Sequence, residues 1–221
     1  MTMKDYRPEE IEKKSMEIIA EELRGRNIVL PGENAPVVKR VIHTTADFDF
    51  AENLYFSKDA VRAGIDALKK QVMIVTDTNM ALSGINRNGL NALGADAVCY
   101  MADAEVAEEA KRMQTTRARI AVKKACGIHA NCIYAAGNAP TALYTIAEEM
   151  EQGYAPALVI AVPVGFVNVV EAKEEIKTVC AKHDVPLIAA MGRKGGSTVA
   201  AAILNALIYE AADMNDPGKR M

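Results

Sequence analysis

Short apolar runs alternate with longer stretches of helical periodicity over residues 72–211. Each run is four to six residues long, which is typical of strands buried on both faces. The predicted strands are residues 72–75, 97–101, 132–136, 157–162 and 186–191. The predicted helices between and after them are residues 79–91, 104–125, 140–151, 168–182 and 197–211. This alternation predicts a three-layer α/β/α sandwich with five parallel strands.

The chain before the first strand is predicted to form helices that precede this α/β core. The first covers residues 8–24, with Pro8 as a start signal and Gly25 as a stop signal. Ser15 lies four residues from an isoleucine on either side and is expected to point into the apolar stripe of this helix. The members of that stripe are Ile11, Ile18, Ile19 and Leu23.

Two more helices follow in this segment. The second covers residues 35–43 and places Arg40 and His43 on one face, because they are three residues apart. The third begins after Ser57, whose hydroxyl is the expected N-cap.

Length and composition narrow the class of protein. The 221 residues predict a single domain, with a helical segment of about residues 8–70 packed on a core of about residues 71–211. Half of the residues are hydrophobic and the net charge is −3, which argues against general binding to nucleic acid or to a membrane surface. The N-terminus is polar, and no apolar run approaches the roughly 20 residues of a membrane span. We therefore expect a cytoplasmic protein.

The four cysteines are expected to be reduced thiols. Cys126, His129 and Cys132 are spaced three apart, and Cys180 and His183 repeat that spacing. Such soft ligands could hold zinc, but the spacing matches no familiar zinc motif. Two separate places with small buried thiols are the plainer interpretation, so we expect no metal site.

Unusual chemistry gathers where the predicted strands end, which is the edge at which open parallel sheets bind ligands. The segments there are "TDTNMALSG", "GNAPTALY", "PVGF" and "GRKGGSTVAAAILNAL". Each leads into a helix whose N-terminal amides favour an anion. The candidate binding residues at this edge are Asp77, Met80, Gly137, Asn138, Gly165, Arg193, Lys194, Gly195, Gly196 and Ser197.

The "GRKGGS" segment is the strongest anion-binding candidate of this group. Its glycines allow close approach of the backbone to a ligand, Arg193 and Lys194 add positive charge, and Ser197 can cap the next helix. It matches neither the P-loop nor the GxGxxG pattern, and it could be a plain turn. Asp77 could likewise be a simple N-cap, and Arg117 of "QTTRA" a solvated surface charge.

His43 in "RVIHTTADFDF" is the candidate for proton transfer. It is one of three histidines, and its neighbours Arg40, Thr44 and Asp47 could set its protonation state. A structural histidine is the alternative. No GxSxG or HExxH pattern is present, so one proton donor beside an anionic pocket fits better than hydrolysis.

These segments resemble the signature segments of the precorrin isomerase family, the precorrin-8X methylmutases. The resemblance covers "RVIHTTADFDF", "TDTNMALSGIN", "GNAPTAL", "PVGF" and "GRKGGSTVAAAILNAL", in order, from residue 40 to about 208. It implies an isomerase of cobalamin biosynthesis that moves a methyl group from C11 to C12 of a corrin precursor, giving cobyrinate or hydrogenobyrinate. It also implies a flavodoxin-like sheet and a homodimer with sites near the subunit interface.

The resemblance assigns roles to particular residues. The family's proton donor and acceptor falls on His43, and its substrate contacts fall on Ser15, Arg40 and Arg117. A large apolar ring with many carboxylates needs cations at its rim and apolar side chains across its face. The plausible apolar walls are Met80, Leu82, Phe166 and Val167.

The resemblance also bears on the substrate and partners. It implies no redox cofactor and no protein-bound metal, so any cobalt belongs to the substrate. The "HTTADFDF" and "TDTNMALSGIN" segments look closer to the cobalt-containing branch, which favours cobalt-precorrin-8 over the metal-free substrate. Hand-off of the corrinoid from a neighbouring pathway enzyme stays open. Where the family has "PVGFVGAAESK", this chain has "PVGFVNVVEAK", so the loop at 168–170 is expected to meet the ring differently.

Two rival functions use the same residues. A corrinoid-binding module without catalysis would keep the pocket and would not need His43. A phosphate- or nucleotide-dependent enzyme would use "GRKGGS" and would bind nucleotide.

Overall fold

The protein is built around a six-stranded sheet, and its computed structural model describes residues 7–220 except for the side chains of residues 8 and 9. The strands are β1 (Leu54–Phe56), β2 (Ile74–Thr76), β3 (Ala97–Val98), β4 (Ile133–Ala136), β5 (Leu158–Ala161) and β6 (Leu187–Ala190). Their order across the sheet is β1-β6-β5-β4-β2-β3. The last five are parallel and lie in the predicted apolar runs, except that β2 extends one residue beyond its run, which confirms the α/β class.

The prediction of five strands in an all-parallel sheet was wrong, because β1 pairs antiparallel with β6 at the edge. Three residues are too few to show a pattern in the sequence. Ser57 extends this pairing, since its amide donates to the Leu187 carbonyl at 2.9 Å and its hydroxyl accepts from the Leu187 amide. Ser57 is therefore not the N-cap of the next helix; Asp59, in the left-handed conformation, occupies that position.

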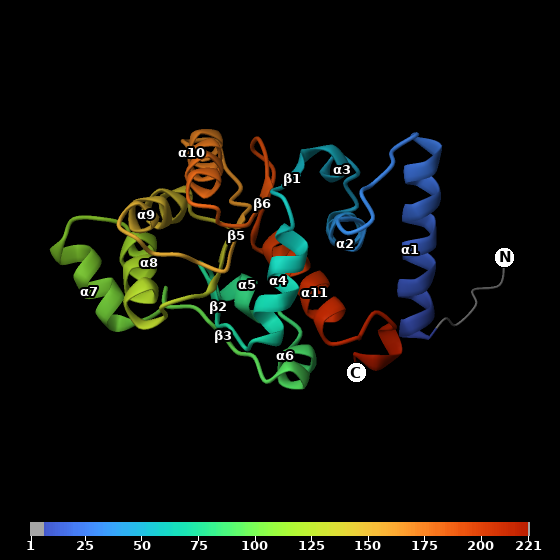
Figure 1. Ribbon diagram of the computed structural model, residues 1–221, viewed down its shortest axis with the longest axis horizontal. Coiled ribbons are helices and arrows are strands. Elements are labelled where there is room, and N and C mark those ends of the chain that lie inside the picture. The colour runs from blue at the N-terminus through green and yellow to red at the C-terminus, as the bar shows by residue number, and fades with distance from the viewer. Residues whose placement is uncertain (1–6, 221) are drawn as a thin grey trace.

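Helices cover both faces of the sheet (Figure 1). They are α1 (Pro8–Gly25), α2 (Ala35–Thr45), α3 (Phe50–Asn53), α4 (Ala60–Lys69), α5 (Asn79–Ser83), α6 (Arg87–Leu93), α7 (Ala104–Arg112), α8 (Arg117–Ile128), α9 (Pro140–Glu151), α10 (Val169–Lys182), α11 (Ser197–Ala211) and the 3₁₀ turn η1 (Pro217–Lys219). Along β4, Ile133 and Ala135 face the core under α4 and α11, while Tyr134 and Ala136 face the core under α8, α9 and α10. This alternation is why each strand is apolar throughout.

Two predicted helices are each divided in the structure. Residues 79–91 form α5 and α6, because the Asn86 side chain caps a new helix by accepting from the Gly89 amide at 2.7 Å. Residues 104–125 form α7 and α8, because Gln114 adopts a positive φ and Thr116 caps α8. The remaining predicted helices are single elements.

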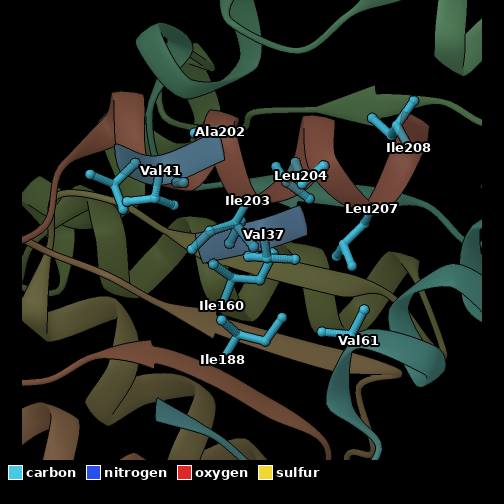
Figure 2. Packing of buried hydrophobic residues seen from close by; sticks show 14 of the residues in the cluster. Val37, Val41, Val61, Ile160, Ile188, Ala202, Ile203, Leu204, Leu207 and Ile208 are labelled. Atoms are coloured by element: carbon cyan, nitrogen blue, oxygen red, sulfur yellow. The ribbon is translucent and has the colours of Figure 1, made fainter. Parts of the chain in front are cut away.

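Helix α11 is apolar on nearly every side because it lies between the sheet and α2. Figure 2 shows Val37 and Val41 of α2 against Ile203 and Leu204 of α11, with strand residues such as Ile160 beyond them. Helix α1 in turn packs against α2. The N-terminal helices thus form an additional layer outside the sandwich (Figure 1).

The apolar stripe predicted on α1 is only half buried. Ile19 and Leu23 are 7% and 3% exposed, whereas Ile11 and Ile18 are 53% and 49% exposed. The helix therefore meets α2 with its C-terminal half, and part of the stripe faces outward. None of the helices described between residues 7 and 220 is long and apolar enough to cross a membrane.

Strand β2 lies between β3 and β4, so the chain leaves it first toward one edge of the sheet and then returns to the other side. In open α/β sheets this reversal opens a crevice at the carboxyl ends of the strands. The segments after β2 and β4 meet there.

Candidate active site

His43 lies in the last turn of α2, one turn beyond Arg40. Val37 and Val41 bury one face of α2 against α11, which leaves Arg40 and His43 half-buried on the side of the helix. The helix ends at Ala46, which adopts the left-handed conformation with its amide donating to the Ile42 carbonyl at 2.7 Å. The predicted sharing of one face by Arg40 and His43 follows from this geometry.

The environment of His43 favours a neutral imidazole. Burial lowers its pKa below the usual value, the positive charges of Arg40 and Arg220 lower it further, and the negative charge of Glu12 partly opposes them. Within residues 7–220, no group hydrogen-bonds to the imidazole. A half-buried ring whose nitrogens are both available is suited to contact a ligand rather than to hold the fold together.

Arg40 belongs to a charged cluster that joins three distant parts of the chain. Its guanidinium donates to the Glu12 carboxylate of α1 at 2.7 Å, and the guanidinium of Arg220 pairs with the same oxygen. Both guanidinium groups lie over the ring of Tyr209, at 5.1 Å for Arg40 and 3.9 Å for Arg220. Burial alone would raise the pKa of Glu12, but the two arginines lower it overall, so the cluster carries a net positive charge.

In the part of the chain that the structure describes, Arg40 lines two hollows beside this cluster. One, of about 240 Å³, lies between α2, α5 and α11, and its lining includes Arg40, Thr44, Met80, Thr198 and Tyr209. The other, of about 510 Å³, lies between α1 and the C-terminal segment, and its lining includes Glu12, Met16, Arg40 and Arg220. Cations and apolar side chains therefore meet at one surface next to His43.

Asp77 is not an N-cap of its own helix. Its buried carboxylate reaches across the crevice and accepts the amides of Gly137, Asn138 and Ala139, each at 2.8 Å. Burial raises the pKa of Asp77, while these three donors oppose the rise because they hydrogen-bond to the carboxylate form. The amides at the start of α9 are therefore occupied by the chain's own anion, and Gly137 and Asn138 offer no free amides to a ligand there.

The "GRKGGS" loop is anchored closely to the sheet. The Gly196 amide donates to the Val162 carbonyl at 2.8 Å, and a side chain at Gly195 would collide with that carbonyl. The Lys194 ammonium pairs with Asp47 at 2.7 Å and Asp49 at 2.6 Å, so its charge is already balanced. These contacts weaken the prediction that the loop is an open anion site.

The end of the loop departs from the prediction at Ser197. Gly196, not Ser197, is the N-cap of α11, and the Ser197 hydroxyl instead bonds to the Thr78 hydroxyl at 2.8 Å. Arg193 is exposed, with its guanidinium 5.5 Å from the ring centre of Phe166, and its carbonyl accepts from the Gly165 amide at 3.3 Å. The loops after β5 and β6 therefore lie side by side.

The structure brings most of the predicted residues to one edge, whereas Arg117 and Ser15 have no hydrogen bond to any of them within residues 7–220. Arg117 is exposed at the start of α8, and no hydrogen bond or ion pair joins it to the other predicted residues within the described chain. The Ser15 hydroxyl donates to the Ile11 carbonyl of its own helix at 2.9 Å. Ser15 lies one turn from Glu12, which places it beside the arginine cluster.

Sequence reasoning missed several residues of this region. Glu12 looked like one of many surface carboxylates, and Arg220 follows a Pro217–Gly218 turn in a segment without helical or strand pattern. Lys173 was also missed; it is fully buried in α10 and donates to two carbonyls of the "GRKGGS" loop. Periodicity gives no signal for a lysine whose partners lie about 20 residues away.

The cysteine and histidine groups do not converge. His129 hydrogen-bonds to Tyr100 at 2.7 Å, and His183 faces Glu151 at 3.3 Å. Among residues 7–220, no group of three or more metal-binding side chains is placed to hold an ion. Burial raises the pKa of the Cys126 and Cys180 thiols to about 12, which is typical of inert structural cysteines.

Comparison with known proteins finds relatives that all carry the name of one enzyme family. Residues 10–210 match the family model described as precorrin-8X methylmutase. The chain is 44% identical to a cobalt-precorrin-8 methylmutase of Priestia megaterium, over 90% of this chain and 87% of the relative. It is 42% identical to a protein of the same name from Salmonella typhimurium, over 91% and 95% of the two chains. A solved structure of precorrin-8X methylmutase from Thermus thermophilus is 41% identical, with a TM-score of 0.82 over 92% and 96% of the two chains.

Proposed function

Because this chain belongs to the precorrin-8X methylmutase family, it is an isomerase of cobalamin biosynthesis, and we propose that His43 is the group that assists methyl transfer from C11 to C12 of a corrin precursor. The observation that carries this proposal is the half-buried imidazole, which has no hydrogen-bond partner among residues 7–220 and lies beside a net positive cluster. Transfer of a methyl group within one molecule needs no nucleophilic side chain and no activated water.

The proposed step conserves all atoms and electrons. The carbon–carbon bond to the methyl group breaks as a bond to the adjacent ring carbon forms, so no oxidant, reductant or second substrate is consumed. His43 hydrogen-bonds to, or protonates, the conjugated ring near the migrating methyl and afterwards recovers the proton. One positioned acid contributes about 10²–10⁴-fold to such a rate, and the remainder comes from holding the macrocycle in a reactive shape.

The substrate's carboxylates are proposed to meet the guanidinium groups of Arg40 and Arg220, which lie at the two hollows. Guanidinium groups suit this role because they bind carboxylates with two parallel hydrogen bonds. Met80 is 67% exposed and Phe166 82% exposed, and both are proposed to contact the apolar face of the ring. A carboxylate next to Arg40 would raise the pKa of His43 in the complex, because it adds negative charge nearby.

We propose the cobalt-containing substrate, cobalt-precorrin-8, which the names of the two most similar relatives described above support. Cobalt would enter as part of that substrate, and we propose no cofactor of the protein itself. The parallel strands follow an order that, counted from β2, is 2-1-3-4-5, which supports a flavodoxin-like core. We further propose a single cytoplasmic domain over residues 1–221 that acts as a homodimer, since the exposed Ile11 and Ile18 of α1 are suited to cover by a second subunit.

The test is turnover by His43→Ala. The purified variant is incubated with cobalt-containing and with metal-free substrate, and conversion to the corrin is followed by absorbance spectra. We expect turnover to fall by about 10²–10⁴-fold while substrate binding and the circular dichroism spectrum stay close to wild type. His183→Ala is the matched control, since that histidine pairs with Glu151 on the surface.

Near-normal turnover by His43→Ala would contradict the proposed role. Binding of corrin without turnover by the wild-type protein would favour the non-catalytic module instead. Binding of nucleotide would favour the rival use of the "GRKGGS" loop.

A further inference from the structure

Lys173 is a buried lysine whose side chain binds backbone carbonyls. Its side chain is 0% exposed in the second turn of α10, and its ammonium donates to the carbonyls of Gly192 and Lys194, each at 2.9 Å. No ion pair involves it in the chain from residue 7 to residue 220. A charge this deep is costly unless it is hydrogen-bonded, so the two carbonyls that it binds are central to its place in the fold.

Both of its acceptors belong to the loop that follows β6. Gly192 and Gly195 adopt φ values of +71° and +156°, conformations that turn the backbone sharply here. The ammonium lies beneath the turn, and the carbonyls point inward to it instead of outward to water. Removing the donor would leave two carbonyls unpaired on the inner side of the loop.

The same loop is tied to the segment that follows His43. Lys194 extends its side chain to Asp47 and Asp49, and the Asp47 amide donates to the Thr45 hydroxyl at 3.2 Å. Thr45 is the last residue of α2, two positions after His43. A continuous series of contacts therefore runs from Lys173 through the loop to the end of the helix that carries the imidazole.

We propose that Lys173 is a positioning residue: its ammonium fixes the backbone of residues 192–194, and Lys194 transmits that placement to residues 45–49 and so to His43. The ammonium itself touches no substrate, because it lies below the loop. The kinetic part of this proposal rests on the proposed function, whereas the structural part stands without it.

The test uses Lys173→Met, which keeps an unbranched apolar side chain, one heavy atom shorter, and removes the donor. Hydrogen–deuterium exchange is measured on the free protein at pH 7, together with kcat and KM for the cobalt-containing substrate. We expect faster exchange confined to residues 192–197 and 44–49, with β5 and the remainder of α10 unchanged. We expect kcat to fall at least tenfold with a smaller change in KM, because the imidazole is misplaced rather than the binding surface removed.

Two further variants sharpen the test. Lys182→Met makes the same change on the same helix at an exposed residue that pairs with Glu151, and it should leave exchange and kinetics at wild-type values. Lys194→Met should speed exchange at residues 44–49 but leave the Gly196 amide protected by the Val162 carbonyl, because the contacts of Lys173 with the loop remain.

Each outcome decides the proposal. Exchange that rises evenly through α10, β5 and β6 would show a general role in stability and overturn it. Unchanged exchange at residues 44–49 in Lys173→Met would overturn the transmission to His43. If the wild-type protein fails to convert the corrin substrate, the proposed function fails, while the exchange pattern still tests the placement of the loop.

Discussion

Replacing Glu12 with glutamine removes the negative charge that Arg40 and Arg220 share. Removal of one partner from a buried ion pair costs about 3–5 kcal/mol, because the other partner stays buried without compensation. Here the side chains of Glu12, Arg40 and Arg220 keep exposures of 23%, 15% and 8%, so water screens the remaining charges in part. We therefore expect a loss of about 2–3 kcal/mol in the free energy of unfolding.

The measurement is thermal unfolding followed by circular dichroism at pH 7. For a chain of this length, 1 kcal/mol corresponds to about 2–4 °C, so Tm should fall by about 5–10 °C. Glu17→Gln is the control, because Glu17 forms a more exposed pair on the same helix and should shift Tm by less than about 3 °C. An unchanged Tm in Glu12→Gln would refute the inference that this carboxylate joins α1, α2 and the C-terminal segment.

The same variant tests the electrostatics of His43. The charge of Glu12 raises the pKa of His43, while burial, Arg40 and Arg220 lower it. Loss of that charge should lower the pKa further, and imidazole resonances followed by NMR titration would measure it. A higher pKa in the variant would contradict the arrangement of charges around the ring.

Two further predictions concern pH and the glycine loop. Because burial lowers the pKa of His43 below 6.5, the unfolded chain binds this proton more tightly, so the contribution of His43 to stability is fully present above pH 6.5 and is lost as pH falls toward the folded pKa. In the free enzyme the same pKa should appear as a change in kcat/KM below pH 6.5, whereas kcat, which reports the complex with substrate, should change at higher pH. Equal pH profiles for kcat/KM and kcat would contradict the binding of a carboxylate near Arg40. Gly195→Ala should lower the free energy of unfolding, measured by urea titration, by about 2–4 kcal/mol, since φ is +156° and the new Cβ would lie 2.2 Å from the Val162 carbonyl oxygen. Gly153→Ala is the control: φ is +99° with open space around it, and the loss should be about 1 kcal/mol. Equal losses would show that the loop can move away from the new side chain.

The sequence predicted the core more fully than the site. Strands such as β4 and β5 are apolar on both faces because helices cover both faces, so every residue in a row is apolar and the strand can be recognised from the sequence. Arg40 and His43 were paired correctly because they lie on one helix, where spacing decides proximity. Roles for Ser15 and Arg117 came from family resemblance, and their proposed contacts with substrate stay predictions.

What the sequence did not predict depends on long-range contacts. Glu12 and Arg220 are separated by 208 positions, and nothing local distinguishes either from a surface charge. The edge strand β1 has three residues and is fixed by its partner β6 rather than by its own pattern. Asp77 was predicted as a binding residue, with an N-cap as the alternative, because sequence spacing cannot show that its oxygens cross to the amides after β4.

The position of Asp77 also has a consequence for what can compete at the crevice. Its carboxylate is covalently tethered opposite the first amides of α9, so its effective concentration there far exceeds that of any dissolved phosphate or sulfate. Free anions would have to displace a preorganised ligand that never diffuses away. A dissolved phosphate therefore meets amides that are already occupied, and it is the Asp77 side chain that provides this selectivity against other anions.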